Sequence, residues 1–165
     1  MIRQRLGKDL LFFDGGMGTL LQEKGLAPGE LPETWNLTHS EEIYKIHRQY
    51  IEAGSDIILT NTFGANALKF HDDSCSLEEI IKAAVSHVKK AEREALLQTG
   101  DERKIYTALD VGPTGKLLKP MGDLEFETAY EAFKEVVILG EQAGADLIHI
   151  ETMSDTYELK AAVLA

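Results

Sequence analysis

Four polar side chains end four short apolar runs of the chain. They are Asp14, Asn61, Asp110 and Glu151, and each lies beside a cluster of glycines or small polar residues. Short runs rich in Ile, Leu and Phe are typical of buried parallel strands, whose carboxyl ends bind ligands in β/α proteins. Three carboxylates and an amide, with no basic residue among them, suit a substrate that carries an ammonium group.

Two of these acids, Asp14 and Glu151, allow three interpretations. They could act as a general acid/base pair, or they could bind one cation from two strand ends. They could instead cap the helices that follow the strands. Capping explains Asp14 more easily than Glu151, because Glu is a weak N-cap residue and Glu151 directly follows an apolar run.

The segment Gly15-Gly16-Met17-Gly18 resembles a phosphate-binding loop only superficially. The dinucleotide fingerprint that starts at Gly16 requires a glycine where Leu21 stands, and the Gly-Lys-Ser/Thr ending of a Walker loop is absent. Asp14 would also repel a phosphate. The glycines are expected instead to let backbone N–H groups approach a small carboxylate, and a simple tight turn is the alternative.

The histidines and the cysteine give weaker signals. His149 lies two residues before Glu151 on the same strand face, where it could shuttle protons, although a core residue is the favoured interpretation. His71 and Cys75 have a spacing that some metal sites use, but without further ligands nearby they do not predict zinc binding. The other histidines fall on or near predicted helices and are expected to be surface or packing residues: His39, His47 and His87.

The composition is that of one globular domain. The 165 residues are 44% hydrophobic and 27% charged, with a net charge of −11 and a pI of about 4.9. This acidity argues against nucleic acid and against anionic membrane surfaces as partners. No apolar stretch approaches the ~20 residues of a membrane span. A single cysteine excludes an intrachain disulfide, and a cytoplasmic location is the default expectation.

Helices are predicted between the apolar runs. Their signals are the capping boxes Thr38-x-x-Glu41 and Ser76-x-x-Glu79 and the stop residues Gly54 and Gly144. Residues 25–36 are predicted to form a long loop. The expected helices are Thr38 to Gly54, Leu77 to Leu97, Leu124 to Ala143, and one that begins near Ser154 or Asp155.

The resulting β-α alternation predicts an α/β fold with a parallel sheet. A β/α barrel has eight strands, and this chain provides four, so we expect residues 1–165 to be the N-terminal half of such a barrel. The apolar helical pattern is still running at Ala165, which also indicates truncation. A doubly wound sheet of four or five strands is the alternative.

Four motifs in register carry a resemblance. The stretches 11–19, 60–65, 112–115 and 150–155, together with 52–58, resemble the homocysteine S-methyltransferase family over nearly the whole chain. The Gly112-Pro-Thr-Gly115 form and the run 158–163 most resemble the homocysteine module of cobalamin-dependent methionine synthases.

The resemblance implies a (β/α)8 TIM barrel, of which this chain covers about the first four β/α units. It also implies methyl transfer to the thiol of homocysteine, which forms methionine. Asp14 and Glu151 would hold the substrate ammonium, the backbone around Gly15 its carboxylate, and Asn61 and Thr62 would line the pocket. The implied substrate-binding set is Asp14, Gly15, Gly16, Asn61, Thr62 and Glu151.

The family uses zinc held by three cysteines, which would lie beyond Ala165. Cys75 matches none of them, so no metal ligand and no catalytic residue is expected in this chain, and the chain alone is expected to be inactive. The implied donor is methylcobalamin, recharged from methyltetrahydrofolate on other modules of the same polypeptide. The alternatives are a standalone enzyme with a methylsulfonium or betaine donor, and a non-catalytic half-barrel that binds an amino acid or associates with itself.

Overall fold

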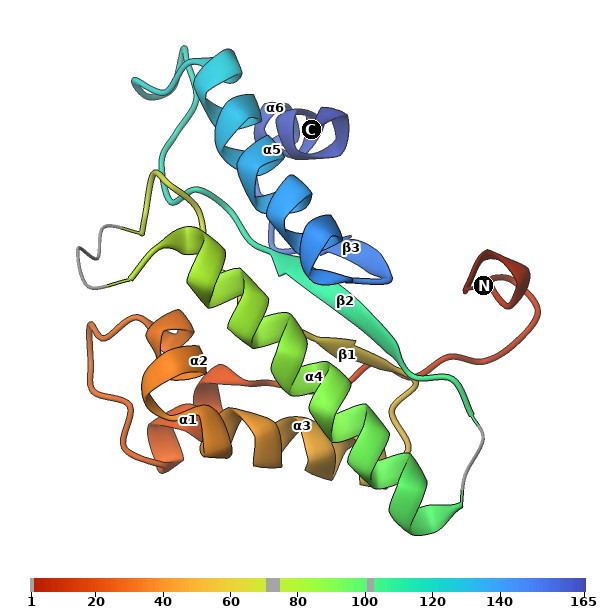
Figure 1. Cartoon of the computed structure of the whole chain (residues 1–165). Helices are drawn as coiled ribbons and strands as arrows, with labels where there is room; N and C mark the ends of the chain where they lie inside the picture. The colour runs from red at the N-terminus through yellow and green to blue at the C-terminus, as the bar shows by residue number, and fades with distance from the viewer. Residues whose placement is uncertain (1, 71–74, 101–102) are drawn as a thin grey trace.

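The computed structural model of the chain describes residues 2–70, 75–100 and 103–165 (Figure 1). A three-stranded sheet lies at its centre, and helices connect the strands. In chain order the elements are η1 Ile2–Gln4, α1 Gly18–Glu23, η2 Pro32–Thr34, α2 Trp35–Thr38, α3 Ser40–Ala53, β1 Ile57–Leu59, α4 Leu77–Thr99, β2 Tyr106–Val111, α5 Phe126–Ala143, β3 Leu147–Ile150 and α6 Thr156–Leu164.

The sheet has the order β1-β2-β3, and both pairs of neighbours are parallel. Ile57 is in register with Tyr106, and Ala108 with Leu147. Because α4 and α5 cross between successive parallel strands, the predicted α/β class with a parallel sheet is confirmed. The parallel arrangement also brings the carboxyl ends of all three strands to one edge of the sheet.

The first apolar run does not form a full strand among the described residues. Phe13 makes an isolated parallel bridge to Ile57, and the N–H of Ile57 donates to the carbonyl oxygen of Phe12 at 3.0 Å. The expectation of four complete strands is therefore not confirmed. The physical reason is that this segment pairs on one side only, and Leu10 is left 76% exposed.

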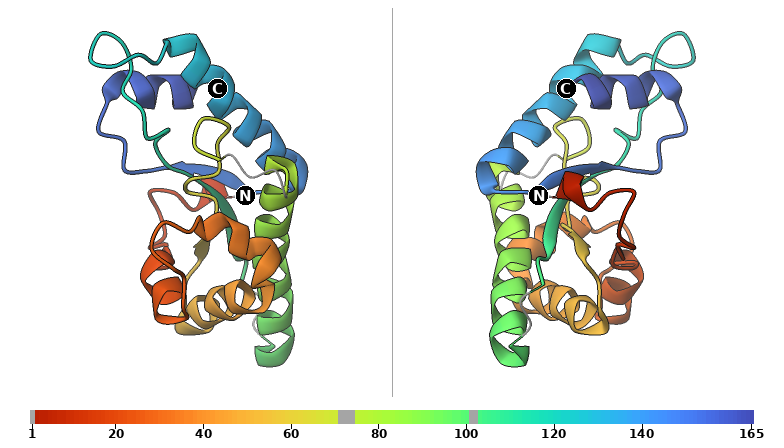
Figure 2. Two further views of the ribbon diagram at one scale, coloured as in Figure 1. Left: turned by 90° about the vertical axis from the view of Figure 1, so that its left-hand side faces the viewer. Right: turned by 90° about the vertical axis from the view of Figure 1, so that its right-hand side faces the viewer.

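Helices α4 and α5 lie along one face of the sheet (Figures 1 and 2). Helix α4 packs against α3 on one side and α5 on the other. The main core lies between these helices and the sheet, where Leu109 of β2 meets Ile80 and Phe133. A smaller cluster on Ile57, Tyr106 and Ala108 includes Ile2 and Leu11 from the N-terminal segment. This packing fixes the sheet edge that carries the polar residues.

The helix boundaries test the predicted caps. The capping box of Ser76 and Glu79 is formed, and Gly54 and Gly144 end their helices with positive φ values of 112° and 96°, as predicted. The box at Thr38 is wrong, because the Thr38 hydroxyl donates to the carbonyl oxygen of Thr34 in the preceding turn. Helix α3 begins at Ser40 without a side-chain cap.

Two further boundaries differ from expectation. The predicted loop 25–36 contains the 3-10 helix η2 and the start of α2, and its Trp35 is buried. Helix α5 begins at Phe126 and not at Leu124, because Leu124 forms an isolated bridge with Leu118. The last helix begins after Asp155, as predicted, and the Asp155 side chain caps it by accepting a hydrogen bond from the N–H of Tyr157. None of the described helices combines the length and apolarity required to cross a membrane.

Candidate amino-acid binding site

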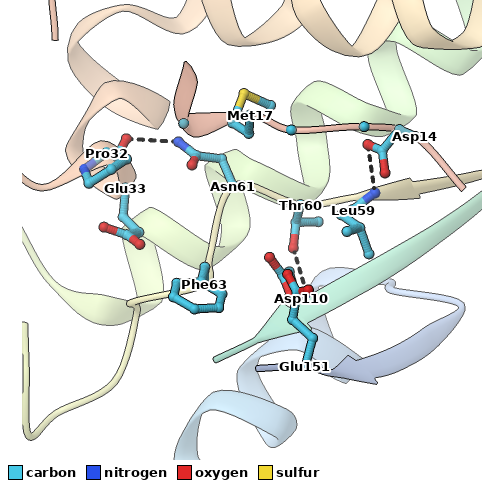
Figure 3. Close-up of a pocket in the computed structure, with 13 residues that line it drawn as sticks. Asp14, Met17, Pro32, Glu33, Leu59, Thr60, Asn61, Phe63, Asp110 and Glu151 are labelled. Atoms are coloured by element: carbon cyan, nitrogen blue, oxygen red, sulfur yellow. Dashed lines mark hydrogen bonds between the residues drawn. The ribbon is translucent and has the colours of Figure 1, made fainter. Parts of the chain in front are cut away.

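A cavity of about 440 Å³ opens at the carboxyl ends of the strands (Figure 3). Four carboxyl groups line it, from Asp14, Glu33, Asp110 and Glu151, and no basic side chain does so among the described residues. We call it the acidic cavity. Its lining residues are Asp14, Gly15, Gly16, Met17, Gly18, Pro32, Glu33, Leu59, Thr60, Asn61, Phe63, Asp110 and Glu151.

Asp14 lies where the first apolar run meets β1. Its N–H donates to the carbonyl oxygen of Ile57 at 3.0 Å, and its Oδ2 accepts a hydrogen bond from the N–H of Leu59 at 3.1 Å. Its Oδ1 is buried without a hydrogen-bond partner among the described residues. Burial, with a smaller contribution from the nearby Glu151, raises the pKa of Asp14 to about 7. A cation in the cavity would stabilise its ionised form.

The glycines after Asp14 form one wall of the cavity. A Cβ atom on Gly15 would lie 2.9 Å from the hydroxyl oxygen of Tyr50, so a larger residue would collide with that ring. The Tyr50 hydroxyl donates to the carbonyl oxygen of Gly16 at 3.1 Å. The lack of a side chain at Gly15 therefore makes room for the Tyr50 ring, and both Gly15 and Gly16 line the cavity.

Asn61 and Thr62 differ in their relation to the cavity. Asn61 lines it, and its Nδ2 donates to the carbonyl oxygen of Pro32 at 2.7 Å. Thr62 is buried behind the lining, where its hydroxyl donates to the carbonyl oxygen of Asp110 at 2.7 Å. Phe63 lines the cavity in its place. Thr62 thus supports the wall, whereas Asn61 faces the interior.

Asp110 and Glu151 come from neighbouring strands. The N–H of Asp110 donates to Oγ1 of Thr60 at 3.1 Å, and the N–H of Glu151 donates to the carbonyl oxygen of Val111 at 3.1 Å. This pairing brings the two carboxyl groups together (Figure 3). Burial, followed by the charge of Glu151 and a hydrogen bond with it, raises the pKa of Asp110 well above its usual range.

Glu33 is a lining residue that the sequence analysis did not find. It is 3% exposed, and its Oε1 accepts a hydrogen bond from the N–H of Gly64 at 2.5 Å. Its Oε2 is buried with no hydrogen-bond partner in the described part of the chain. Glu33 belongs to η2, inside a segment predicted as loop, so no strand-end signal marked it. Its hydrogen bond to Gly64, in the segment that follows β1, holds it at the site.

The histidine and cysteine candidates that the structure describes are not among the residues that line the acidic cavity. The ring of His149 is centred 4.9 Å from that of Phe13, and His149 does not line the acidic cavity. His71 lies outside the described residues. Cys75 packs against the main core cluster. Within residues 2–70, 75–100 and 103–165, no group of three or more His, Cys, Asp or Glu side chains could hold a metal ion. The family's zinc therefore does not fit the described residues of this chain.

Comparison with known proteins identifies relatives. The family model for homocysteine S-methyltransferase matches residues 11–165. Methionine synthases of Mycobacterium leprae and Mycobacterium tuberculosis are 32% and 33% identical to the chain over 98% and 96% of its length. The homocysteine methyltransferase MmuM of Escherichia coli aligns in its oxidised form with a TM-score of 0.82 and 24% identity over 97% of this chain. Its metallated form aligns with a TM-score of 0.82 and 23% identity.

These matches cover only part of the relatives. The chain spans 14% of the length of each methionine synthase and 59–60% of the two MmuM chains. The structural likeness establishes a shared α/β fold, and the family model covers nearly the whole chain. The chain therefore belongs to the homocysteine S-methyltransferase family.

Proposed function

We propose that this protein methylates the thiol of homocysteine to give methionine, and that residues 1–165 recognise the amino-acid end of the substrate. The observation that carries the proposal is the acidic cavity, where four carboxyl groups and no basic side chain of the described residues face one space at the strand ends. A buried acidic cavity favours a positively charged group and disfavours an anion. The α-ammonium group of an amino acid meets this requirement.

In this proposal each wall of the cavity has a role. The carboxylates of Asp14 and Glu151 accept hydrogen bonds from the ammonium group. The backbone of Gly15 and Gly16 approaches the substrate carboxylate, at the wall that Tyr50 holds in place. Asn61 lines the space between them, and Thr62 acts indirectly through its hydrogen bond to Asp110.

The chemical step requires an activated thiol. The family's zinc would lower the pKa of the homocysteine thiol, so that a thiolate attacks the methyl group. We propose that the zinc cysteines and the chemical step lie outside residues 1–165, as the family resemblance implies. We also propose that residues 1–165 alone are catalytically inactive.

For the methyl donor we propose methylcobalamin, recharged from methyltetrahydrofolate on other modules. The support is the identity of 32–33% to two methionine synthases, against 24% to MmuM. A standalone enzyme with a methylsulfonium or betaine donor is the second candidate. A non-catalytic amino-acid-binding domain is the third, and the same cavity would serve it. The proposed location is the cytoplasm, with homocysteine as the ligand and no nucleic-acid or membrane partner.

Calorimetric binding measurements test the recognition step. The protein at its natural length is titrated with L-homocysteine, L-methionine, and 4-(methylthio)butanoate, which lacks the ammonium group. Because a hydrogen bond between charged groups contributes about 1.5–3 kcal/mol, we expect the deaminated analogue to bind at least roughly tenfold more weakly than L-methionine. Equal affinity for both would show that the acidic cavity does not read the ammonium group.

Methyl transfer assays with each donor class test the donor. Methionine formation from methylcobalamin, and none from a methylsulfonium or betaine donor, is the expected result. A reversed preference would favour the second candidate, and binding of L-homocysteine without turnover would favour the third.

A further inference from the structure

Three carboxyl oxygens in the acidic cavity have no hydrogen-bond partner among the described residues: Asp14 Oδ1, Glu33 Oε2 and Asp110 Oδ1. Glu33 is 3% exposed and Asp110 is 6% exposed, so water reaches them poorly. Burying an ionised carboxylate is strongly unfavourable unless a cation or hydrogen-bond donors compensate it. Four ionised groups in one such space would also repel one another. A proton on one of these carboxyl groups would relieve both of these unfavourable effects.

The geometry points to Asp110 and Glu151 as the pair that holds the proton. Figure 3 shows the side chains of Asp110 and Glu151 next to each other at the cavity, and two neighbouring carboxyl groups cannot both ionise easily. The N–H of Asp110 donates to the hydroxyl oxygen of Thr60, and the N–H of Glu151 donates to the carbonyl oxygen of Val111, so that Asp110 is held on β2 and Glu151 directly after β3. The pair therefore does not depend on a flexible loop for its approach.

The acidic groups around Asp110 all raise its pKa. Glu151 after β3, Asp14 before α1 and Glu33 in η2 are acidic, and each raises the pKa of Asp110. The ammonium of Lys69 lies 5.4 Å from the ring centroid of Phe63, but Lys69 is exposed and does not line the cavity. The ring of His149, also on β3, packs against Phe13. No cationic side chain lines the cavity in the described structure to replace the proton.

We propose that Asp110 and Glu151 share one proton in the ligand-free site, and that the ammonium group of the amino acid displaces it to solvent on binding. This inference rests on the proposed recognition of an amino acid by the acidic cavity. Asp110 is then a positioning residue. Its protonated carboxyl donates to the carboxylate of Glu151 and keeps that group aimed at the cavity until the ammonium group arrives. At this pair of carboxyl groups one positive charge replaces another.

Proton displacement makes binding pH-dependent, with a definite sign. Where the free site holds the proton and the complex does not, ligand affinity rises about tenfold for each unit of pH increase. Where the free pair has already lost the proton, this dependence disappears. Affinity for the amino acid should therefore rise across the neutral range and then level off, until the ligand's own amino group titrates.

The test counts protons released on binding. L-methionine is the probe, because it has the ammonium group but no thiol proton. The protein at its natural length is titrated near neutral pH in buffers with different ionisation enthalpies, as wild type and as Asp110→Asn. Glu131→Gln, an exposed change on α5, is the control. We expect Asp110→Asn to release fewer protons per methionine than wild type, and its affinity to depend less on pH. Asp14 can also release a proton, and it does so in both proteins, so the difference reports on Asp110.

An identical proton count in wild type and Asp110→Asn would overturn the inference, while tight methionine binding would leave the proposed function intact. If methionine does not bind at all, both fail. Infrared spectroscopy gives a second readout that does not require the variant. The carbonyl stretch of a protonated carboxyl group should be present in the free wild-type protein and should disappear when methionine is added. A band that is absent from the free protein, or that methionine leaves unchanged, contradicts the shared proton or its displacement.

Discussion

The carboxylate of Asp14 accepts a hydrogen bond from the N–H of Leu59 at 3.1 Å, and so joins the first apolar run to the end of β1. The other oxygen of the same carboxylate lies buried at the acidic cavity without a hydrogen-bond partner among the described residues. One side chain thus completes the sheet edge and forms part of the proposed ligand site. The two roles of Asp14 can be measured separately, as an effect on stability and an effect on ligand binding.

The first prediction concerns the recognition of the ammonium group. Glu151→Gln keeps the size of the side chain but removes its charge. Loss of a charge-assisted hydrogen bond of about 1.5–3 kcal/mol should weaken homocysteine binding roughly ten- to a hundredfold. Under the proposed function, the zinc content of the protein at its natural length should be unchanged. KM and metal content measure both effects, with Glu131→Gln as the control. A KM equal to that of wild type would remove Glu151 from the site.

The second prediction concerns the stability cost of Asp14. Burial raises its pKa from 3.8 to about 7, so between these pH values the folded form keeps a proton that the unfolded chain has lost. The free energy of unfolding therefore decreases as pH rises across this window and levels off above it. Asp14→Asn removes this penalty and retains an acceptor for Leu59.

We expect Asp14→Asn to be more stable than wild type by about 1–2 kcal/mol in mildly alkaline buffer, after discounting for partial solvent contact, and similar to wild type near pH 4. Ligand binding should be lost at the same time. Urea unfolding at several pH values measures the difference. A stability gap that is independent of pH would show that the carboxyl of Asp14 does not titrate in this way.

The third prediction concerns the loss of stability at acidic pH that is caused by His47. This side chain is fully buried, neither ring nitrogen has a hydrogen-bond partner in the described structure, and burial lowers its pKa from 6.5 to about 3. Below its unfolded pKa the unfolded chain binds a proton that the folded form does not, so stability falls as pH decreases from 6.5 toward 3. His47→Leu should flatten this decline.

Gln142→Ala, an exposed change at a side chain that does not titrate, provides the control and should keep the acid limb of the wild-type stability curve. Thermal melting between mildly acidic and neutral pH compares the three proteins. If His47→Leu and wild type lose stability in parallel on acidification, His47 is not the titrating group.

The fourth prediction concerns metal binding by the isolated chain. Residues 1–165 should hold no stoichiometric zinc, because their single cysteine and scattered histidines cannot provide three clustered ligands. Elemental analysis after extensive dialysis measures the metal content. Equimolar zinc that disappears in Cys75→Ser would assign a ligand role to Cys75 and would revise the proposed location of the zinc site.

The fifth prediction concerns association of the isolated chain. Leu10, Phe12, Tyr157 and Val163 are 76%, 55%, 61% and 66% exposed. Exposed apolar side chains and a segment that pairs on one side favour association. We expect isolated residues 1–165 to dimerise or aggregate and to bind hydrophobic dyes. Sedimentation and melting curves check this, with Phe12→Ser expected to reduce association. A sharply melting monomer that binds homocysteine tightly would show that these residues are a complete domain.

The sequence by itself determined the class of fold, the family resemblance and most of the cavity. Periodicity and turn residues located the helices, and the ends of the apolar runs marked Asp14, Asn61, Asp110 and Glu151, all four of which line one cavity. This worked because parallel strands must place their carboxyl ends together, so order along the chain is enough to predict which residues converge.

Tertiary structure alone decided the remaining features. The first apolar run has strand-like residues, but a strand requires partners, and pairing on one side leaves only the bridge at Phe13. Thr38 and Glu41 have the spacing of a capping box, but the Thr38 hydroxyl instead donates to the carbonyl oxygen of Thr34. Glu33 lies at the cavity because its carboxylate accepts a hydrogen bond from the N–H of Gly64, which is 31 positions away in the sequence. Thr62 lies behind the cavity wall because its hydroxyl donates a hydrogen bond to the carbonyl oxygen of Asp110. Each outcome depends on a contact between segments distant in the chain, which local pattern cannot encode.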